Sequence, residues 1–203
     1  IDQILNEGRL GLAERQCRAF LKKNPTHTYA MSLLSEIANR LGYFDDAEFL
    51  LEKAVEFKPN DGDLRMQYAA ILRKKQKFAK TMEQVNILCD QYPDNPIYQA
   101  QKASEIMQNG DHAQAIKMFD DILNKNPYNF STHTSKGHAQ KTLGKTDRAI
   151  KSYQSAYQIK PDHGEAYFSL ANLKTYSFNT DELNSMRNQV ERVDLSLRDK
   201  SYF

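Results

Sequence analysis

The apolar positions of this 203-residue chain recur at helical spacing in successive short segments. Two neighbouring stripes illustrate the pattern, and they consist of Met31, Leu34 and Ala38, then Phe44, Ala47, Leu51 and Ala54. Residues three and four apart share one face of a helix, so each stripe predicts an amphipathic helix with one buried side. The pattern therefore predicts pairs of short helices and no strands.

The prolines show how these pairs repeat. Five of the six stand 34 residues apart, at Pro25, Pro59, Pro93, Pro127 and Pro161. A fixed period of this length is typical of stacked helix pairs, each of which buries its apolar face against its neighbours. With proline at position 32, full repeats start at residues 28, 62, 96 and 130, the first helix of a sixth starts at 164, and a partial repeat precedes them.

Two further positions support this frame. Position 20 is alanine in four repeats (Ala13, Ala47, Ala115 and Ala149), with Thr81 as the exception, and position 15 is glycine at Gly8, Gly110 and Gly144. A small residue lets two antiparallel helices cross closely. Glycine ends a helix because it adopts the left-handed conformation without a Cβ clash.

The period, together with these alanine, glycine and proline positions, resembles the tetratricopeptide repeat (TPR) family over nearly the whole chain. The resemblance implies an all-α, right-handed solenoid of antiparallel helix pairs, with about five to six repeats. It is weakest in the third repeat, which has Thr81 at position 20 and Gln76 at position 15.

The regular pattern ends near residue 177. Position 15 of the sixth repeat is Phe178 and position 20 is Leu183, while Asn179 and Glu182 have the spacing of a helix-capping box. We expect a TPR array over 1–177, then an irregular helix and the start of a further, truncated helix over 178–203. Because the frame places Ile1 inside a helix, we also expect a longer natural protein, with some of Leu183, Met186, Leu195 and Leu197 exposed at this end.

The segment YFSLANLKTYSFNTDELNSM, followed by DLSLRDK, resembles the last regular repeat of bacterial proteins that join TPR arrays to a sulfotransferase domain. This second resemblance implies a C-terminal enzyme domain that uses phosphoadenosine phosphosulfate. The phosphosulfate-binding loop of that enzyme is not in this sequence.

Composition narrows the function classes. Lys and Arg total 28 against 26 Asp and Glu, and this balance does not favour nucleic-acid binding. No apolar run is long enough to span a membrane. The two cysteines, Cys17 and Cys89, fit a reducing, cytoplasmic compartment and are expected in the core.

We find no catalytic, metal-binding or cofactor-binding pattern. His133 and His138 are five residues apart and do not share a helix face, and paired carboxylates such as Asp45 and Asp46 lie at helix starts, where they complement the helix dipole. The chain itself is therefore expected not to be an enzyme, with no cofactor.

The remaining candidate is the inner face of the first helices, where positions 2, 5, 9, 12 and 13 would line a concave groove. The candidates are Tyr29, Ser32, Glu36, Asn39, Arg40, Asp63, Met66, Arg73, Lys74, Ile97, Ser104, Met107, Gln108, Thr134, His138, Lys141, Glu165, Phe168, Asn172 and Tyr176. Exposed aromatic and aliphatic groups on a polar ground suit peptide recognition. Alternatively, the basic members only complement helix C-termini.

The carboxylate clamp of chaperone-binding TPR domains is absent from these positions. It needs Lys and Asn at positions 5 and 9, where Ser32 and Glu36 stand in the second repeat. We therefore expect a scaffold that binds a protein, a peptide or another domain of its own protein. The alternative is an accessory domain that positions substrate for a sulfotransferase.

Overall fold

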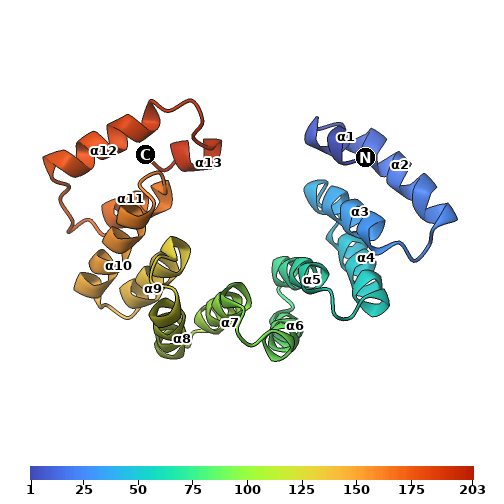
Figure 1. Ribbon diagram of the computed structural model, residues 1–203, viewed down its shortest axis with the longest axis horizontal. Coiled ribbons are helices and arrows are strands. Elements are labelled where there is room, and N and C mark those ends of the chain that lie inside the picture. Colours follow the sequence, from blue (N-terminus) through green and yellow to red (C-terminus); the bar gives the residue numbers. More distant parts are fainter. The chain divides into compact units, whose positions relative to one another are not determined.

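The computed structural model describes residues 1–203 with the exception of the Asn6 side chain, and within that part 74% of the residues are helical and none lies in a strand. Figure 1 shows the order of the helices along the chain. They are α1 (Asp2–Asn6), α2 (Leu10–Lys23), α3 (Thr28–Arg40), α4 (Phe44–Phe57), α5 (Gly62–Lys74), α6 (Phe78–Gln91), α7 (Pro96–Gln108), α8 (His112–Lys125), α9 (Phe130–Thr142), α10 (Thr146–Ile159), α11 (Gly164–Ala171), α12 (Thr180–Val190) and α13 (Leu197–Lys200).

The predicted frame is confirmed. The first helices of the full repeats and of the sixth repeat begin at Thr28, Gly62, Pro96, Phe130 and Gly164, which are the residues that the 34-residue period assigns to position 1. Each first helix is followed by a second helix of the same repeat. The all-α fold built from helix pairs is therefore correct.

The chain forms two compact units, unit 1 (Ile1–Tyr98) and unit 2 (Gln99–Phe203), which are described separately. In unit 1, α3 packs on α2 and α4, and α5 packs on α4 and α6. These units do not correspond to the predicted division at residue 177, which is defined by the sequence repeats. That division stays a prediction.

Small residues make the helix crossings of unit 1. Ala13, Ala47 and Thr81 are fully buried at position 20. Thr81 fits this slot because its hydroxyl donates a hydrogen bond to the Lys77 carbonyl at 3.1 Å, which satisfies the polar group inside the core. Cys17 is fully buried beside Ala13, and burial raises the pKa of its thiol.

The turns between paired helices use the left-handed conformation that the glycine pattern predicts. Gly8, Gly42, Gly110 and Gly144 have φ between 71° and 97°. Gln76 takes the same place in the third repeat with φ 57°, although its Cβ makes this conformation costly. The turn geometry is thus kept where the glycine is missing.

A glycine also sets the closest crossing in unit 2. Gly137 of α9 faces the ring of Tyr153 on α10, and a Cβ built on Gly137 would lie 2.5 Å from Tyr153 Cε1. The Tyr153 side chain is fully buried and packs with Ala149 and Leu170. A ring therefore occupies the space that the absent side chain leaves.

The end of the repeat pattern differs from expectation in one respect. The sixth first helix was expected to be regular, but α11 ends at Ala171 and is 8 residues long instead of 13. The following segment is drawn into tertiary contacts, since the Tyr176 and Phe178 rings meet edge to face at 5.1 Å and Lys174 adopts φ 59°. These contacts replace the last turns of the helix.

The predicted start of α12 is confirmed. Asn179 accepts a hydrogen bond from the Glu182 amide, and Glu182 accepts one from the Asn179 amide, both at 2.9 Å. Ser196 caps the short α13 by accepting a hydrogen bond from the Asp199 amide. Of the apolar residues expected to be exposed here, Leu183 and Leu197 are exposed, whereas Leu195 is buried.

No helix in residues 1–203 is both long enough and apolar enough to cross a lipid bilayer.

Candidate functional site

Adjacent first helices of unit 1 are joined by hydrogen bonds between their side chains. The Tyr29 hydroxyl of α3 donates to Asp2 of α1 at 2.6 Å. Lys74 Nζ of α5 donates to Asn39 Oδ1 of α3 at 2.7 Å. These contacts join α1, α3 and α5. We call the solvent-exposed side chains of these helices, together with Ile97 at the start of α7, the first-helix face of unit 1.

Ser32 and Thr134 do not face solvent, and this corrects the expectation that position 5 lines a groove in every repeat. Both are buried. The Ser32 hydroxyl donates to Gln67 Oε1 of the next first helix at 2.7 Å, and Thr134 Oγ1 lies 2.9 Å from His163 Nε2. A short hydroxyl side chain can be buried here because the next repeat supplies a polar partner.

Position 2 of the first-helix face is exposed in three successive repeats. Tyr29 and Ile97 expose 55% and 63% of their surface, and Asp63 lies between them in the repeat order. These three residues stand at the starts of α3, α5 and α7. The row therefore presents an aromatic, an acidic and an aliphatic side chain in successive repeats.

The other candidates of unit 1 are engaged with one another or half-buried. Arg40 and Glu36 form an ion pair at 2.7 Å on the last turns of α3. Lys74 lies 5.7 Å from the centre of the Phe44 ring in addition to its bond with Asn39. Met66 and Arg73 are half-buried. Lys74 therefore links two neighbouring repeats, whereas Arg40 pairs within its own helix. The alternative interpretation, that the basic residues complement helix C-termini, stays a hypothesis.

In unit 2 the candidate residues of α9 and α11 belong to one polar chain. His138 Nδ1 lies 3.0 Å from the Tyr153 hydroxyl, and its Nε2 lies 3.3 Å from Glu165 Oε1. Arg198 near the end of the chain donates to Glu165 Oε2 at 3.2 Å. The hydrogen bond from His138 lowers the pKa of Glu165 against the opposing effect of burial.

The last residues of the chain lie against α11. The Tyr202 ring is 5.3 Å from the Phe168 ring, and the Phe203 ring is 5.3 Å from that of Tyr167. This segment therefore contacts the α11 candidates Glu165 and Phe168.

Tyr176 is a further correction. It was expected on the inner face of a first helix, but it lies beyond the end of α11, and its hydroxyl donates to the buried carboxylate of Glu182. Of the remaining candidates in unit 2, Ser104 and Met107 are half-buried, whereas Gln108, Lys141 and Asn172 are exposed.

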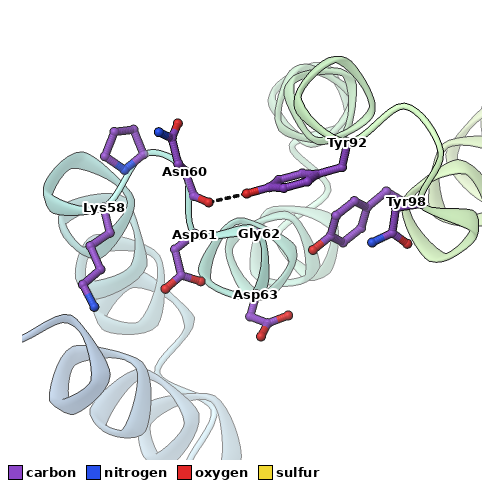
Figure 2. A pocket seen from close by; sticks show the side chains of 9 residues that line it. Lys58, Asn60, Asp61, Gly62, Asp63, Tyr92 and Tyr98 are labelled. Carbon is purple, nitrogen blue, oxygen red and sulfur yellow. Dashed lines mark hydrogen bonds between the residues drawn. The ribbon is translucent and has the colours of Figure 1, made fainter.

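A second feature of unit 1 was not predicted from the sequence. A depression of about 620 Å³ lies where the α4–α5 loop meets the segment between α6 and α7, and we call it the Tyr92–Tyr98 depression (Figure 2). It is lined by Lys58, Pro59, Asn60, Asp61, Gly62, Asp63, Tyr92, Asn95 and Tyr98.

Two tyrosine rings form one side of this depression. Their centres are 5.5 Å apart and their planes are inclined at 59°. The Tyr92 hydroxyl donates to the Asn60 carbonyl, shown as a dashed line in Figure 2. Tyr98 lies against Gly62, and a Cβ there would collide with the Tyr98 hydroxyl.

The carboxylates of the depression act on Tyr98. Burial raises the pKa of Tyr98, and the negative charges of Asp63 and Asp61 raise it further. Asp61 caps α5 by accepting a hydrogen bond from the Leu64 amide at 3.1 Å. Gly62 at position 1, followed by Tyr92 and Tyr98 at the next repeat boundary, is the sequence feature that could have indicated this depression. A periodic pattern, however, does not show that rings pack across a repeat boundary.

Comparison with known proteins supports the repeat assignment. Tetratricopeptide repeat family models match residues 5–63 and 130–163. The stretch between these matches contains Gln76 and Thr81, the two departures from the pattern. No curated protein sequence matches the chain.

Solved TPR proteins have a similar fold at low sequence identity. YrrB, described as a TPR protein with an unusual peptide-binding site, has a TM-score of 0.64 and 15% identity, over 86% of this chain and 88% of its own. TTC0263, a thermophilic TPR protein in Thermus thermophilus, has a TM-score of 0.68 and 16% identity, over 86% and 95%. MamA has a TM-score of 0.66 and 17% identity, over 79% and 94%. The chain thus contains tetratricopeptide repeats and has the all-helical fold of TPR proteins.

Proposed function

We propose that this chain is a protein-interaction scaffold that binds a segment of a partner protein on the first-helix face of unit 1. The observation that carries the proposal is the exposed row of Tyr29, Asp63 and Ile97 at the starts of three successive first helices. Single exposed apolar residues are common on protein surfaces. Here they recur at one position of a repeat, and two of the three helices, α3 and α5, are joined by hydrogen bonds between their side chains.

The rigidity of this face favours binding. Side chains that are already held in place lose little conformational entropy when a partner binds, so more of the contact energy is retained as affinity. Tyr29 is held by its bond to Asp2, and the helices beneath it are joined by the Ser32–Gln67 and Asn39–Lys74 bonds. Aromatic side chains in such positions are typical centres of binding energy.

The chemistry of the row indicates what it would bind. Tyr29 and Ile97 offer apolar contact, and Asp63 offers a negative charge between them in repeat order. A partner segment with apolar side chains on either side of a basic one would match this pattern. YrrB, which is described as having a peptide-binding site, has a similar fold, and this similarity supports peptide binding as the class of function.

A photo-crosslinking experiment tests the proposal. The photoreactive amino acid p-benzoylphenylalanine is placed at Tyr29 in one variant and, as a matched control, at Phe49 in another. Phe49 lies on α4, is also aromatic and exposes 59% of its surface, close to the 55% of Tyr29. We expect a protein partner to crosslink at Tyr29 and not at Phe49.

Affinity measurements with the crosslinked partner complete the test. Replacing a central aromatic contact by alanine typically costs more than ~1 kcal/mol, so Tyr29→Ala should weaken binding at least about fivefold, and Phe49→Ala should leave it unchanged. Equal crosslinking at both positions, or equal affinity of both alanine variants, would refute binding on this face.

A second candidate function is an accessory domain that positions substrate for a sulfotransferase. It rests on the resemblance of the segments at residues 167–186 and 194–200 to TPR–sulfotransferase fusion proteins. The feature that favours a change of architecture at this point is the irregular pair of α11 and α12, in which the Tyr167 and Ser185 hydroxyls lie 3.2 Å apart. Retention of the natural gene product on immobilised adenosine 3′,5′-bisphosphate, with elution by the same free nucleotide, would support this function, and failure of the full-length product to bind would refute it.

A further inference from the structure

We propose that the Tyr92–Tyr98 depression is a binding site for the guanidinium group of an arginine side chain on a partner protein. The site is separate from the row formed by Tyr29 and Ile97, and it shares only Asp63 with it. The inference rests on the proposed function only in assuming that the arginine belongs to a protein.

The tyrosine rings provide the first element of such a site. A guanidinium group is planar and weakly hydrated, and it stacks favourably on aromatic faces. Tyr92 and Tyr98 offer two inclined rings with centres 5.5 Å apart. Both are held before any ligand arrives, Tyr92 by its hydrogen bond to the Asn60 carbonyl and Tyr98 by its contact with Gly62.

The carboxylates provide the second element. Within residues 1–203, apart from the undescribed Asn6 side chain, Asp63 forms no ion pair, and its side chain is exposed next to Tyr98 in Figure 2. Asp61 uses one oxygen to cap the Leu64 amide, which leaves its second oxygen as an acceptor. The rise in the pKa of Tyr98, caused by burial and then by Asp63 and Asp61, is consistent with a negative potential at the rings.

Lys58 is the cation among the residues that line the depression, and it opposes a second positive charge. In Figure 2 it stands on the other side of Asp61 from the two tyrosines. Its long side chain can turn into solvent. An anionic ligand is disfavoured, because the start of α5, where an anion would bind, already has Asp61 as its cap and Asp63 in its first turn.

The preceding repeat boundary has the same architecture with the opposite chemistry. A depression of about 490 Å³ is lined there by Lys23, Asn24, Pro25, Thr26, His27, Thr28, Tyr29 and Lys58. His27 stands at the repeat position of Asp61, Tyr29 at that of Asp63 and Lys58 at that of Tyr92. Its lining residues include no carboxylate. This depression therefore serves as an internal control for the role of negative charge in arginine binding.

The experiment is a titration of the ¹⁵N-labelled chain with N-acetyl-arginine amide, followed by two-dimensional NMR. The neutral isostere N-acetyl-citrulline amide is the matched control ligand. We expect arginine to shift the amide signals of Gly62 and Asp63 in a saturable way, whereas those of Thr26, His27 and Thr28 should not move. Citrulline should bind at least about fivefold more weakly.

Two variants test the contributing groups. Asp63→Asn should weaken arginine binding at least about threefold, and Tyr92→Leu should do the same by removing one stacking face. Unchanged thermal unfolding of Asp63→Asn confirms that the fold is intact, and if Tyr92→Leu is destabilised, Asp63→Asn alone decides the charge requirement. Asp46→Asn, on the exposed first turn of α4, is the control substitution and should leave binding unchanged.

Several results would overturn the inference. These are the absence of saturable shifts at Gly62 and Asp63, equal binding of arginine and citrulline, or equal shifts in both depressions. None of them bears on crosslinking at Tyr29, so failure of this site and failure of the proposed function can be told apart.

Discussion

Replacing Gly137 by alanine should destabilise unit 2, although the same substitution usually stabilises a helix. The added Cβ would lie 2.5, 2.7 and 2.9 Å from the Cε1, Cδ1 and Cζ atoms of Tyr153. The ring must therefore move by about 1 Å to restore ordinary contacts of 3.4 Å or more. It cannot do so freely, because it is fully buried and its hydroxyl bonds His138 at 3.0 Å.

The expected magnitude follows from three effects. Forcing extra volume into a packed core costs about 1–3 kcal/mol. Loss of the Tyr153–His138 hydrogen bond adds about 1 kcal/mol. Alanine returns about 1 kcal/mol through its greater helix propensity. The net loss should be about 1–3 kcal/mol, and we expect the unfolding midpoint to fall by several degrees, since ~1 kcal/mol corresponds to roughly 2–4 °C in a chain of this size.

Gly11→Ala is the matched control for this measurement. Gly11 also lies in a helix, α2, but its added Cβ would meet no atom within 4 Å. This variant should be unchanged or gain up to about 1 kcal/mol. Urea unfolding followed by circular dichroism measures both free energies. A Gly137→Ala variant as stable as the parent chain would show that the crossing of α9 and α10 is looser than the structure indicates.

Three further predictions concern stability. Burial lowers the pKa of His163, so below about pH 6.5 the unfolded chain binds a proton that the folded chain does not. The free energy of unfolding should therefore fall as the pH is lowered from 7 to 5. A His163→Gln variant should show a flatter pH profile in urea titrations, and parallel profiles of the two chains would contradict this. Glu182→Ala removes a cap and leaves tyrosine hydroxyls without their acceptor, so it should cost about 2–3 kcal/mol by thermal unfolding, while Glu191→Ala at the exposed end of the same helix should cost almost nothing. Gln76→Gly should raise the unfolding midpoint by relieving a left-handed conformation that costs about 1 kcal/mol, although the greater conformational entropy of glycine in the unfolded chain offsets part of this gain. An unchanged or lower midpoint would contradict the prediction.

The period of the sequence predicted where the helices lie because each repeat meets the same physical demands. A proline stops one helix, a glycine turns the chain and an alanine permits the crossing, and these requirements are local. The starts of α3, α5, α7, α9 and α11 were therefore predicted to the residue. Thr81 departed from the pattern without consequence, because its hydroxyl finds a carbonyl within its own helix.

What the sequence did not predict depends on partners from other repeats. Buried Ser32 bonds Gln67, which is 35 residues away, and Tyr176, beyond the early end of α11, accepts a hydrogen bond from Gln154 of the preceding repeat at 3.0 Å. The Tyr92–Tyr98 depression likewise depends on rings that pack across a repeat boundary. Periodicity identifies the face on which a residue lies, but not the distant side chain that it meets there.

Lys58 has a consequence that reaches beyond either depression, because it lines both of them. A ligand that draws this ammonium group toward one depression withdraws it from the other. If both depressions bind ligands, their occupancies are thermodynamically linked, because an anion beside His27 would draw the Lys58 ammonium group away from the neighbouring depression and so strengthen cation binding there.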